Sequence, residues 1–203
     1  MFDVQLRRRI DPALNRMATI LAKTGVSANA LTIFGALLGV TAGVALTVEY
    51  YLLALLLVII NRIIDGLDGA LARVNGPSLW GGYLDSIADY IFYVAVPVGF
   101  GLANPDNLVP ALLLVASFTL TAVSFLAYAA IAVKAGNAEH GEDAQSPKAF
   151  LYSAGMMEGG ETIGFFIAMC AFPAHFAPLA LLFSGLCILT VGQRVWISRR
   201  QLL

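Results

Sequence analysis

Four aspartates lie in two closely spaced pairs within strongly apolar sequence. Asp65 and Asp68 belong to the segment DGLDGALAR, and Asp85 and Asp89 belong to the segment GGYLDSIAD. A carboxylate at membrane depth costs roughly 2.5–3.5 kcal/mol on insertion scales, so four of them require a compensating cation or a water-filled site. The four aspartates therefore predict a functional centre.

The spacing of these aspartates places each pair on one face of a helix. Asp65 and Asp68 stand three residues apart, and Asp85 and Asp89 stand four apart, which are the separations of neighbours on a helical face. Only residues 75–78 connect the two segments, so the two helices are antiparallel neighbours. We therefore expect the four carboxylates to face one another.

Crowded carboxylates indicate a divalent metal site, because like charges at short range disfavour one another's ionised form unless cations are present. Hard oxygen ligands suit Mg²⁺ or Mn²⁺, and Mg²⁺ usually keeps waters and substrate phosphates in its shell. Four nearby glycines leave room for a bulky ligand or a close backbone: Gly66, Gly69, Gly81 and Gly82. Helix packing is the alternative for a single glycine, and a proton relay for a single aspartate. Neither explains four aspartates at this spacing.

The composition indicates the elements that must position this site. The chain has 203 residues, of which 59% are hydrophobic and 12% charged, and soluble domains rarely have such a composition. We expect an all-α membrane protein with six transmembrane helices, because apolar segments of about 20 residues cross a hydrocarbon core of ~30 Å. The predicted spans are residues 29–48, 50–74, 79–103, 108–133, 155–172 and 176–197.

The N-terminal segment differs from these spans. Residues 2–21 place apolar residues at helical spacing among arginines, which predicts an amphipathic helix lying at the cytoplasmic membrane interface. A short disordered basic arm is the alternative. The chain is thus expected to form a juxtamembrane helix (residues 1–24) followed by a six-helix bundle (residues 25–203).

The basic residues predict the orientation of the chain, because cytoplasmic loops carry an excess of lysine and arginine. In a six-span arrangement the following residues fall on one side: Arg7, Arg8, Arg9, Arg16, Lys23, Arg73, Lys134, Lys148, Arg194, Arg199 and Arg200. We therefore expect a multi-pass protein of the cytoplasmic (inner) membrane with both termini in the cytoplasm.

The aspartate motif resembles the signature of the CDP-alcohol phosphatidyltransferase family. Asp65 to Arg73 matches Asp-x-x-Asp-Gly-x-x-Ala-Arg, and Gly81 to Asp89 matches the following Gly-x-x-x-Asp-x-x-x-Asp. Seven residues separate Arg73 from Gly81 where the family commonly has eight, so either Gly81 or Gly82 fills the family's glycine position.

A second similarity lies upstream of the aspartates. The run from Asn29 to Thr32 resembles the Asn-x-Leu-Thr that opens the first span in this family, with Ala28 where a proline is often found. Together with the pattern of spans, the resemblance extends over essentially the whole chain and forms a single family domain.

The resemblance implies an enzyme of phospholipid synthesis. Such enzymes move a phosphatidyl group from a CDP-linked lipid, usually CDP-diacylglycerol, to the hydroxyl of a small polar alcohol, and CMP is released. The resemblance also implies a homodimer among membrane lipids, with a site open to the cytoplasm. We expect no nucleic-acid partner.

The resemblance further implies roles for individual residues. Two Mg²⁺ or Mn²⁺ ions would be bound by Asp65, Asp68, Asp85 and Asp89. Asp89 would also be the general base that accepts the proton of the attacking hydroxyl. The nucleotide and its phosphates would lie beside Thr32, Gly69, Ala72 and Arg73.

Three further residues are candidates for the acceptor site. Glu158 and Glu161 stand at the start of the fifth predicted span, where they suit a hydroxyl or ammonium group. Acids at a helix start are also often solvated or complement the helix dipole. Arg62, one turn before Asp65, either binds a phosphate or pairs with an aspartate.

Two other functions compete with the enzyme. A cation transporter or channel would use intramembrane carboxylates to bind ions without turning over lipid. A catalytically silent family member would act as a membrane partner. Only the enzyme is expected to form CMP and a new lipid in a metal-dependent reaction.

Overall fold

The computed structural model describes residues 2–134 and 159–202, and this part of the chain is helical without strands. The helices are α1 (Phe2–Ala22), α2 (Ala28–Thr47), α3 (Tyr51–Asn75), α4 (Leu79–Ala103), α5 (Leu108–Lys134), α7 (Gly159–Ala171) and α8 (Phe176–Leu202). Two short 3₁₀ turns, η1 (Pro105–Asn107) and η2 (Pro173–His175), connect α4 to α5 and α7 to α8. The expected all-α architecture is confirmed.

The helices have the length and composition of a multi-pass membrane protein. Within the described residues, four stretches are long and apolar enough to cross a membrane: Ala28–Thr47, Leu79–Ala103, Pro105–Ile131 and Pro173–Arg200. Helix α3 is not among them because its second half is charged, and α7 has only 13 described residues. The number of spans beyond these four stays a prediction.

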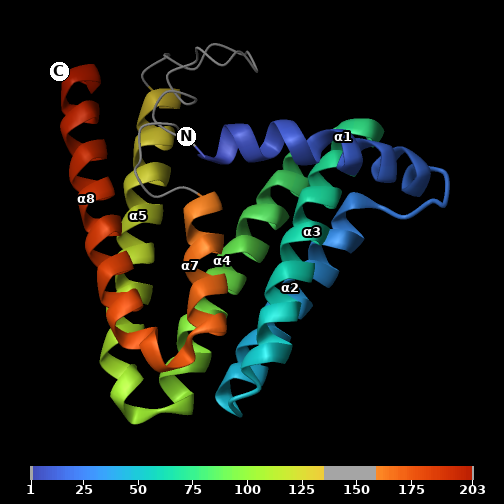
Figure 1. Cartoon of the computed structure of the whole chain (residues 1–203). Coiled ribbons are helices and arrows are strands. Elements are labelled where there is room, and N and C mark those ends of the chain that lie inside the picture. The colour runs from blue at the N-terminus through green and yellow to red at the C-terminus, as the bar shows by residue number, and fades with distance from the viewer. Residues whose placement is uncertain (1, 135–158, 203) are drawn as a thin grey trace.

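The helices run up and down and form two groups that meet at the centre (Figure 1). Helix α2 packs against α3 and α4, whereas α5 packs against α8. Helix α4 contacts α5, and α7 contacts both α3 and α8. The contacts of α4 with α5 and of α7 with α3 therefore join the group of α2, α3 and α4 to the group of α5, α7 and α8.

Buried phenylalanines fill the centre of the bundle. Phe100 stacks on Phe176 with ring centroids 4.3 Å apart, and Phe118 meets Phe183 edge to face at 5.2 Å. Phe92 of α4 contacts Phe166 of α7 at 5.4 Å. Such aromatic pairs add to the stability of a core beyond the area that they bury.

Helix α1 lies across the end of the bundle where both chain termini are found (Figure 1). Part of its apolar surface packs on protein, because Leu14, Ala18 and Leu21 contact a cluster that includes Leu67 and Leu71 of α3. The remaining apolar residues of α1 include the exposed Met17 and Ile20. The helix thus covers one end of α3, and its position at a membrane interface stays a prediction.

Helices α2 and α4 pack closely at Gly43 and Gly99. A Cβ atom added to Gly99 would overlap the carbonyl oxygen of Gly43, and one added to Gly43 would lie 2.7 Å from the carbonyl oxygen of Ala95. Only glycine fits both positions at this backbone separation. This contact fixes the position of α4, and hence of its aspartates, relative to α2.

Replacement of Gly99 by alanine is expected to lower the free energy of unfolding by about 1–3 kcal/mol, because the added methyl group has no space. The effect is measured as the thermal unfolding midpoint of the purified protein in detergent. Gly185→Ala on α8 is the matched control, since a Cβ there meets nothing within 4 Å. Equal midpoints for the two variants would contradict the close packing of α2 on α4.

Candidate metal centre and its flanking cavities

A sharp turn sets the two aspartate helices side by side. Helix α3 ends at Asn75, and Gly76 follows with a φ of 94°, a conformation that glycine adopts without strain. Pro77 comes next, and Ser78 then caps α4 by accepting a hydrogen bond from the backbone N–H of Gly81 at 2.9 Å. The start of α4 therefore lies beside the last turns of α3.

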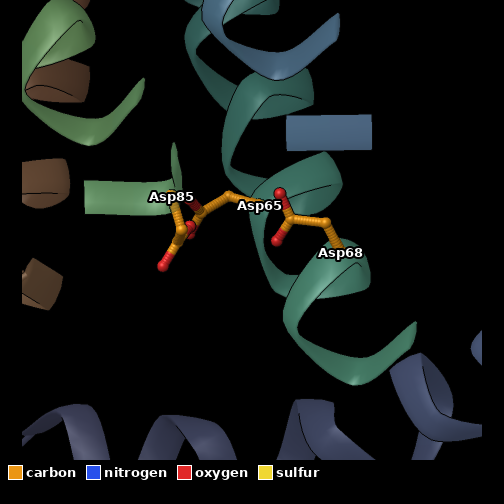
Figure 2. Close-up of side chains that lie close together, drawn as sticks. All are labelled: Asp65, Asp68 and Asp85. Carbon is orange, nitrogen blue, oxygen red and sulfur yellow. The ribbon is translucent and has the colours of Figure 1, made fainter. Parts of the chain in front are cut away.

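Three of the four aspartates form one group. Asp65 and Asp68 of α3 and Asp85 of α4 each offer a carboxylate oxygen, and these oxygens all lie within 4.8 Å of one another (Figure 2). Asp68 is only 4% exposed, Asp65 is half-buried and Asp85 is exposed. Three carboxylates at this range stay ionised together only if a cation is bound, and an all-oxygen donor set suits Mg²⁺ or Mn²⁺. The residues present thus fit a divalent metal ion.

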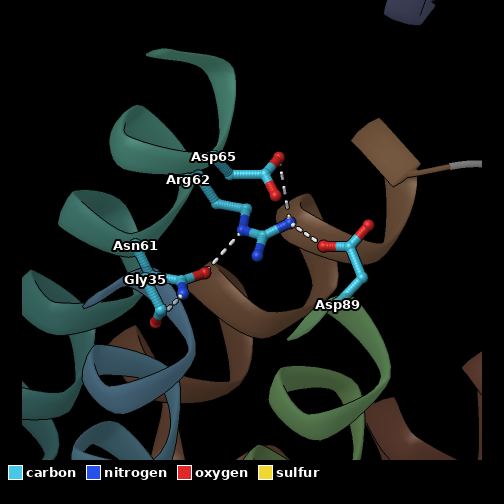
Figure 3. Close-up of polar contacts among 5 residues, drawn as sticks. All are labelled: Gly35, Asn61, Arg62, Asp65 and Asp89. Atoms are coloured by element: carbon cyan, nitrogen blue, oxygen red, sulfur yellow. Dashed lines mark hydrogen bonds and ion pairs between the residues drawn. The ribbon is translucent and has the colours of Figure 1, made fainter. Parts of the chain in front are cut away.

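The fourth aspartate, Asp89, has a different partner. Nη1 of Arg62 donates a hydrogen bond to Oδ1 of Asp89 at 2.9 Å and lies 3.5 Å from Oδ2 of Asp65 (Figure 3). Asp89 is not part of the group of three carboxylates. Of the two roles considered for Arg62, the structure shows the ion pair with aspartate, and a phosphate-binding role stays a prediction.

The guanidinium of Arg62 is held by further contacts. Its Nε donates to Oδ1 of Asn61 at 2.7 Å, and Nδ2 of Asn61 donates to the carbonyl oxygen of Gly35 on α2 at 2.7 Å (Figure 3). The guanidinium carbon also lies 4.3 Å from the centroid of the Phe92 ring, a cation–π geometry. Arg62 is therefore fixed by α2, α3 and α4 together.

A cavity of about 320 Å³ lies on one side of the carboxylate group. Asp68 and Asp85 line it, and so do three residues for which a nucleotide contact was expected: Thr32, Gly69 and Ala72. Arg73, the fourth such residue, is exposed and is not among the lining residues, although its Nη1 lies 3.7 Å from where a Cβ of Gly69 would stand.

The two candidate glycines of α4 differ in their surroundings. Both Gly81 and Gly82 line the smaller cavity. A Cβ on Gly81 would lie 3.0 Å from Oγ of Ser78 and 3.1 Å from Oδ1 of Asn29, whereas one on Gly82 would meet nothing within 4 Å. The tighter steric demand for glycine is therefore at Gly81.

A second cavity, of about 400 Å³, is lined by Asp89. Its wall is largely aromatic and apolar and includes Tyr90, Tyr93, Phe118 and Phe125. Arg194 of α8 also lines this cavity, although the residue is only 7% exposed. Its Nη1 donates to the carbonyl oxygen of Thr121 on α5 at 3.1 Å. Both cavities have volumes within the range of small-molecule sites.

Of the two glutamates expected at the acceptor site, only Glu161 lies among the described residues. Helix α7 contributes Gly159 and Thr162 to the larger cavity, but Glu161 is not among its lining residues. Glu158 lies outside the described residues. Their role in acceptor binding stays a prediction.

Sequence reasoning missed two residues of this region. Asn61 is only 2% exposed and joins α2 to Arg62 through its hydrogen bonds. Its polar side chain stands within an apolar run of the sequence, and this feature could have identified it as a buried polar contact. Arg194 was counted only for membrane orientation. Its contact with a cavity depends on the packing of α5 against α8, which no local pattern reveals.

Comparisons with known proteins agree with the motif. The model of the CDP-alcohol phosphatidyltransferase family matches residues 25–196. The inner membrane protein YnjF of Escherichia coli K12 is 42% identical over 197 residues, which are 97% of this chain and 94% of that protein. Archaetidylinositol phosphate synthase of Pyrococcus horikoshii is 33% identical over 101 residues, which are 49% of this chain and 54% of that protein.

Solved structures show the same fold. Phosphatidylinositol phosphate synthase of Mycobacterium tuberculosis with CDP-DAG bound superimposes with a TM-score of 0.71 at 19% identity, over 91% of this chain and 92% of that one. The same enzyme in complex with manganese and citrate gives a TM-score of 0.72 at 19% identity, over 91% and 88% of the two chains. Because the family model spans most of the sequence, the chain belongs to the CDP-alcohol phosphatidyltransferase family.

Proposed function

We propose that this protein transfers a phosphatidyl group from CDP-diacylglycerol, or a similar CDP-linked lipid, to the hydroxyl of a small alcohol and releases CMP. The observation that carries this proposal is a group of three carboxylates beside one cavity, together with a fourth aspartate that lines a second cavity. Asp68 and Asp85 line the smaller cavity, and Asp89 lines the larger one. A transferase needs such an arrangement, because donor and acceptor must meet at one reactive phosphorus atom.

The smaller cavity suits the nucleotide end of the donor. Gly69 and Ala72 present almost no side chain there, which leaves room for a cytidine. The first residues of α2 and α4, with their caps Ser27 and Ser78, line the same cavity, and helix N-termini favour phosphate groups. The mycobacterial enzyme was solved with CDP-DAG bound, which supports a CDP-linked lipid as the donor.

Asp65, Asp68 and Asp85 are the residues that would hold the metal. A divalent ion bound there supplies positive charge that stabilises the pyrophosphate as CMP leaves. Thr32 lies beside Asp68 on the nucleotide side. The manganese complex of the mycobacterial enzyme supports Mg²⁺ or Mn²⁺ as the cofactor, and the family resemblance implies two ions.

The larger cavity suits the acceptor alcohol. The carboxylate of Asp89 can accept a hydrogen bond from the acceptor hydroxyl and take its proton, so no protein nucleophile is required. Arg194 gives the same cavity a positive charge, which suits an acceptor with an anionic or strongly polar group. Aromatic side chains between α4 and α5 would enclose the rest of the molecule.

Replacement of Arg194 by glutamine is expected to raise the KM for the acceptor about tenfold while the KM for the CDP-lipid stays unchanged. Initial rates of CMP release at varied acceptor and varied donor concentrations measure both constants. Arg199→Gln, an exposed arginine of the same helix, is the matched control. A rise in the donor KM instead would place Arg194 on the donor side and contradict the assignment.

We further propose one membrane domain with six spans, with α1 at the cytoplasmic interface and both termini in the cytoplasm. Helix α3 has 25 residues, or about 37 Å at 1.5 Å per residue, and packs alongside α2. Helices α3 and α8 both end at the same end of the bundle as α1 (Figure 1), and their last turns carry Arg73 and Arg199, which is consistent with the positive-inside rule. The E. coli relative is named an inner membrane protein. A homodimer is part of this proposal by family resemblance.

Turnover tests the proposed reaction directly. Purified protein supplied with CDP-diacylglycerol, a divalent metal and an alcohol should release CMP and form a new phospholipid. Family membership favours this enzyme over a cation transporter, and transport of cations without any CMP release would reverse that preference.

A further inference from the structure

The turn of α3 that carries Asp65 and Asp68 has a second face, opposite its carboxylates. Successive residues of a helix advance by about 100° around its axis, so Asp65 and Asp68 share one side of this turn. Gly66 and Leu67 stand on the other side, against α1. One turn of α3 therefore contacts α1 with one face and presents its carboxylates with the other.

Leu14 of α1 lies directly against Gly66. A Cβ atom added to Gly66 would stand 2.8 Å from Cδ1 of Leu14, so the leucine occupies the space that any side chain at Gly66 would need. One turn further along α1, Ala18 is fully buried and packs in a cluster with Leu67 and Leu71 of α3. Helix α1 is thus fixed on α3 by a stripe of apolar contacts.

These contacts are separate from the centre of the bundle. Among the described residues, the buried cluster around Ala18 shares no member with the larger cluster that holds Phe92, Phe100 and Phe183. A change at the contact between α1 and α3 therefore leaves the packing of the phenylalanines in place, and its effect on the aspartates can be measured in a folded protein.

We propose that α1 positions the metal-binding carboxylates Asp65 and Asp68, with Leu14 as the positioning residue. This inference rests on the proposed function for the metal-binding role of these aspartates. A shift of α1 changes how this turn of α3 faces Asp85 of α4, and groups outside the ligand shell change metal affinity by about 10–100-fold. The exposed Met17 and Ile20 would face lipid at the proposed interface, so the membrane surface would hold α1 on α3.

The test measures Mn²⁺ binding by electron paramagnetic resonance, without substrate, in bilayer nanodiscs that supply the proposed interface. Leu14→Asn places a polar group in the contact with α3 and should raise the Mn²⁺ Kd about tenfold. Thr19→Asn is the matched control, because Thr19 lies on the exposed side of the same helix. It should leave the Mn²⁺ Kd within about twofold.

An exchange of side-chain size tests the contact itself. Gly66→Leu should also raise the Mn²⁺ Kd about tenfold, because the new side chain displaces Leu14 and hence α1. Addition of Leu14→Ala to Gly66→Leu frees that space and should return the Kd to within about threefold of the original value. Gly164→Leu on α7 is the control for size, since a Cβ there meets nothing within 4 Å.

Kinetics give a second readout. If α1 acts through the metal site, Leu14→Asn and Gly66→Leu should lower CMP release at limiting Mn²⁺, and saturating Mn²⁺ should restore most of the rate. A general structural defect would not respond to the metal concentration in this way. Unchanged elution on size-exclusion chromatography identifies the variants that remain folded.

The outcomes separate this inference from the proposed function. An unchanged Mn²⁺ Kd in Leu14→Asn and Gly66→Leu, or no recovery in the double variant, would overturn the role of α1. An absence of CMP release from an unmodified protein that binds Mn²⁺ would contradict the proposed reaction alone. An absence of Mn²⁺ binding to the unmodified protein would contradict both.

Discussion

Replacement of Asp68 by asparagine should reduce CMP release by about a thousandfold, the scale of losses seen when a group that stabilises transition-state charge is removed. Asp68 is the most buried of the three grouped carboxylates and lies next to Thr32 at the nucleotide cavity. Asparagine preserves the size of the side chain but removes the charge that would bind the metal. The loss is measured as the initial rate of CMP release with saturating donor and acceptor.

The matched control for this variant is Asp106→Asn. Asp106 is an exposed acid of the η1 turn, far along the chain from the carboxylate group, and its replacement should leave the rate unchanged. Membrane insertion and expression of both variants should equal those of the unmodified protein. Full activity of Asp68→Asn would exclude the carboxylate group as the reaction centre.

Removal of divalent metal should stop the reaction completely. The group of three carboxylates offers only oxygen ligands within 4.8 Å of one another, and the one charge of Arg62, 3.5 Å from Asp65, offsets only part of its negative charge. We expect EDTA to abolish CMP release, and Mg²⁺ or Mn²⁺ added in excess to restore it. Ca²⁺ should fail, because it prefers more ligands at longer distances than a compact, phosphate-sharing site supplies.

The metal experiment needs a control for folding. Size-exclusion chromatography before and after chelation shows whether the protein remains intact, and recovery of the rate with Mg²⁺ shows that the loss was reversible. Full activity in EDTA, or equal rates with Ca²⁺ and Mg²⁺, would contradict a tight divalent site at Asp65, Asp68 and Asp85.

The helices near the site were predictable because their ends carry local signals. The expected span over residues 79–103 coincides with α4, which Ser78 caps after the turn at Gly76 and Pro77. The spacing of Asp65, Asp68 and Asp85 also predicted their meeting, since a short turn leaves neighbouring antiparallel helices few ways to pack. These features depend on residues close together in sequence.

The place of Asp89 was not predictable in the same way. Its helical face is set by periodicity, but its partner depends on where the long side chain of Arg62 extends. That direction is fixed by Asn61, Gly35 and Phe92, which come from three different helices. The resemblance placed Asp89 with the metal ligands, whereas the structure pairs it with Arg62.

Long-range packing likewise decided two other features. The pattern of α1 predicts a helix with an apolar side, but not that Leu14 and Ala18 cover the end of α3. The charge of Arg194 predicts a location near the cytoplasmic side, but its burial follows from the packing of α8 on α5. Both depend on contacts between residues distant in sequence.

One measurement tests the central claim most directly. Purified protein and its Asp89→Asn variant are incubated with CDP-diacylglycerol, Mg²⁺ or Mn²⁺ and a panel of alcohols, and CMP and new lipids are recorded by mass spectrometry. The proposed function predicts that the unmodified protein alone releases CMP and forms one new phospholipid, whose head group identifies the acceptor. Equal CMP release and lipid formation by the Asp89→Asn variant, or no CMP release with any alcohol, would contradict the proposed function.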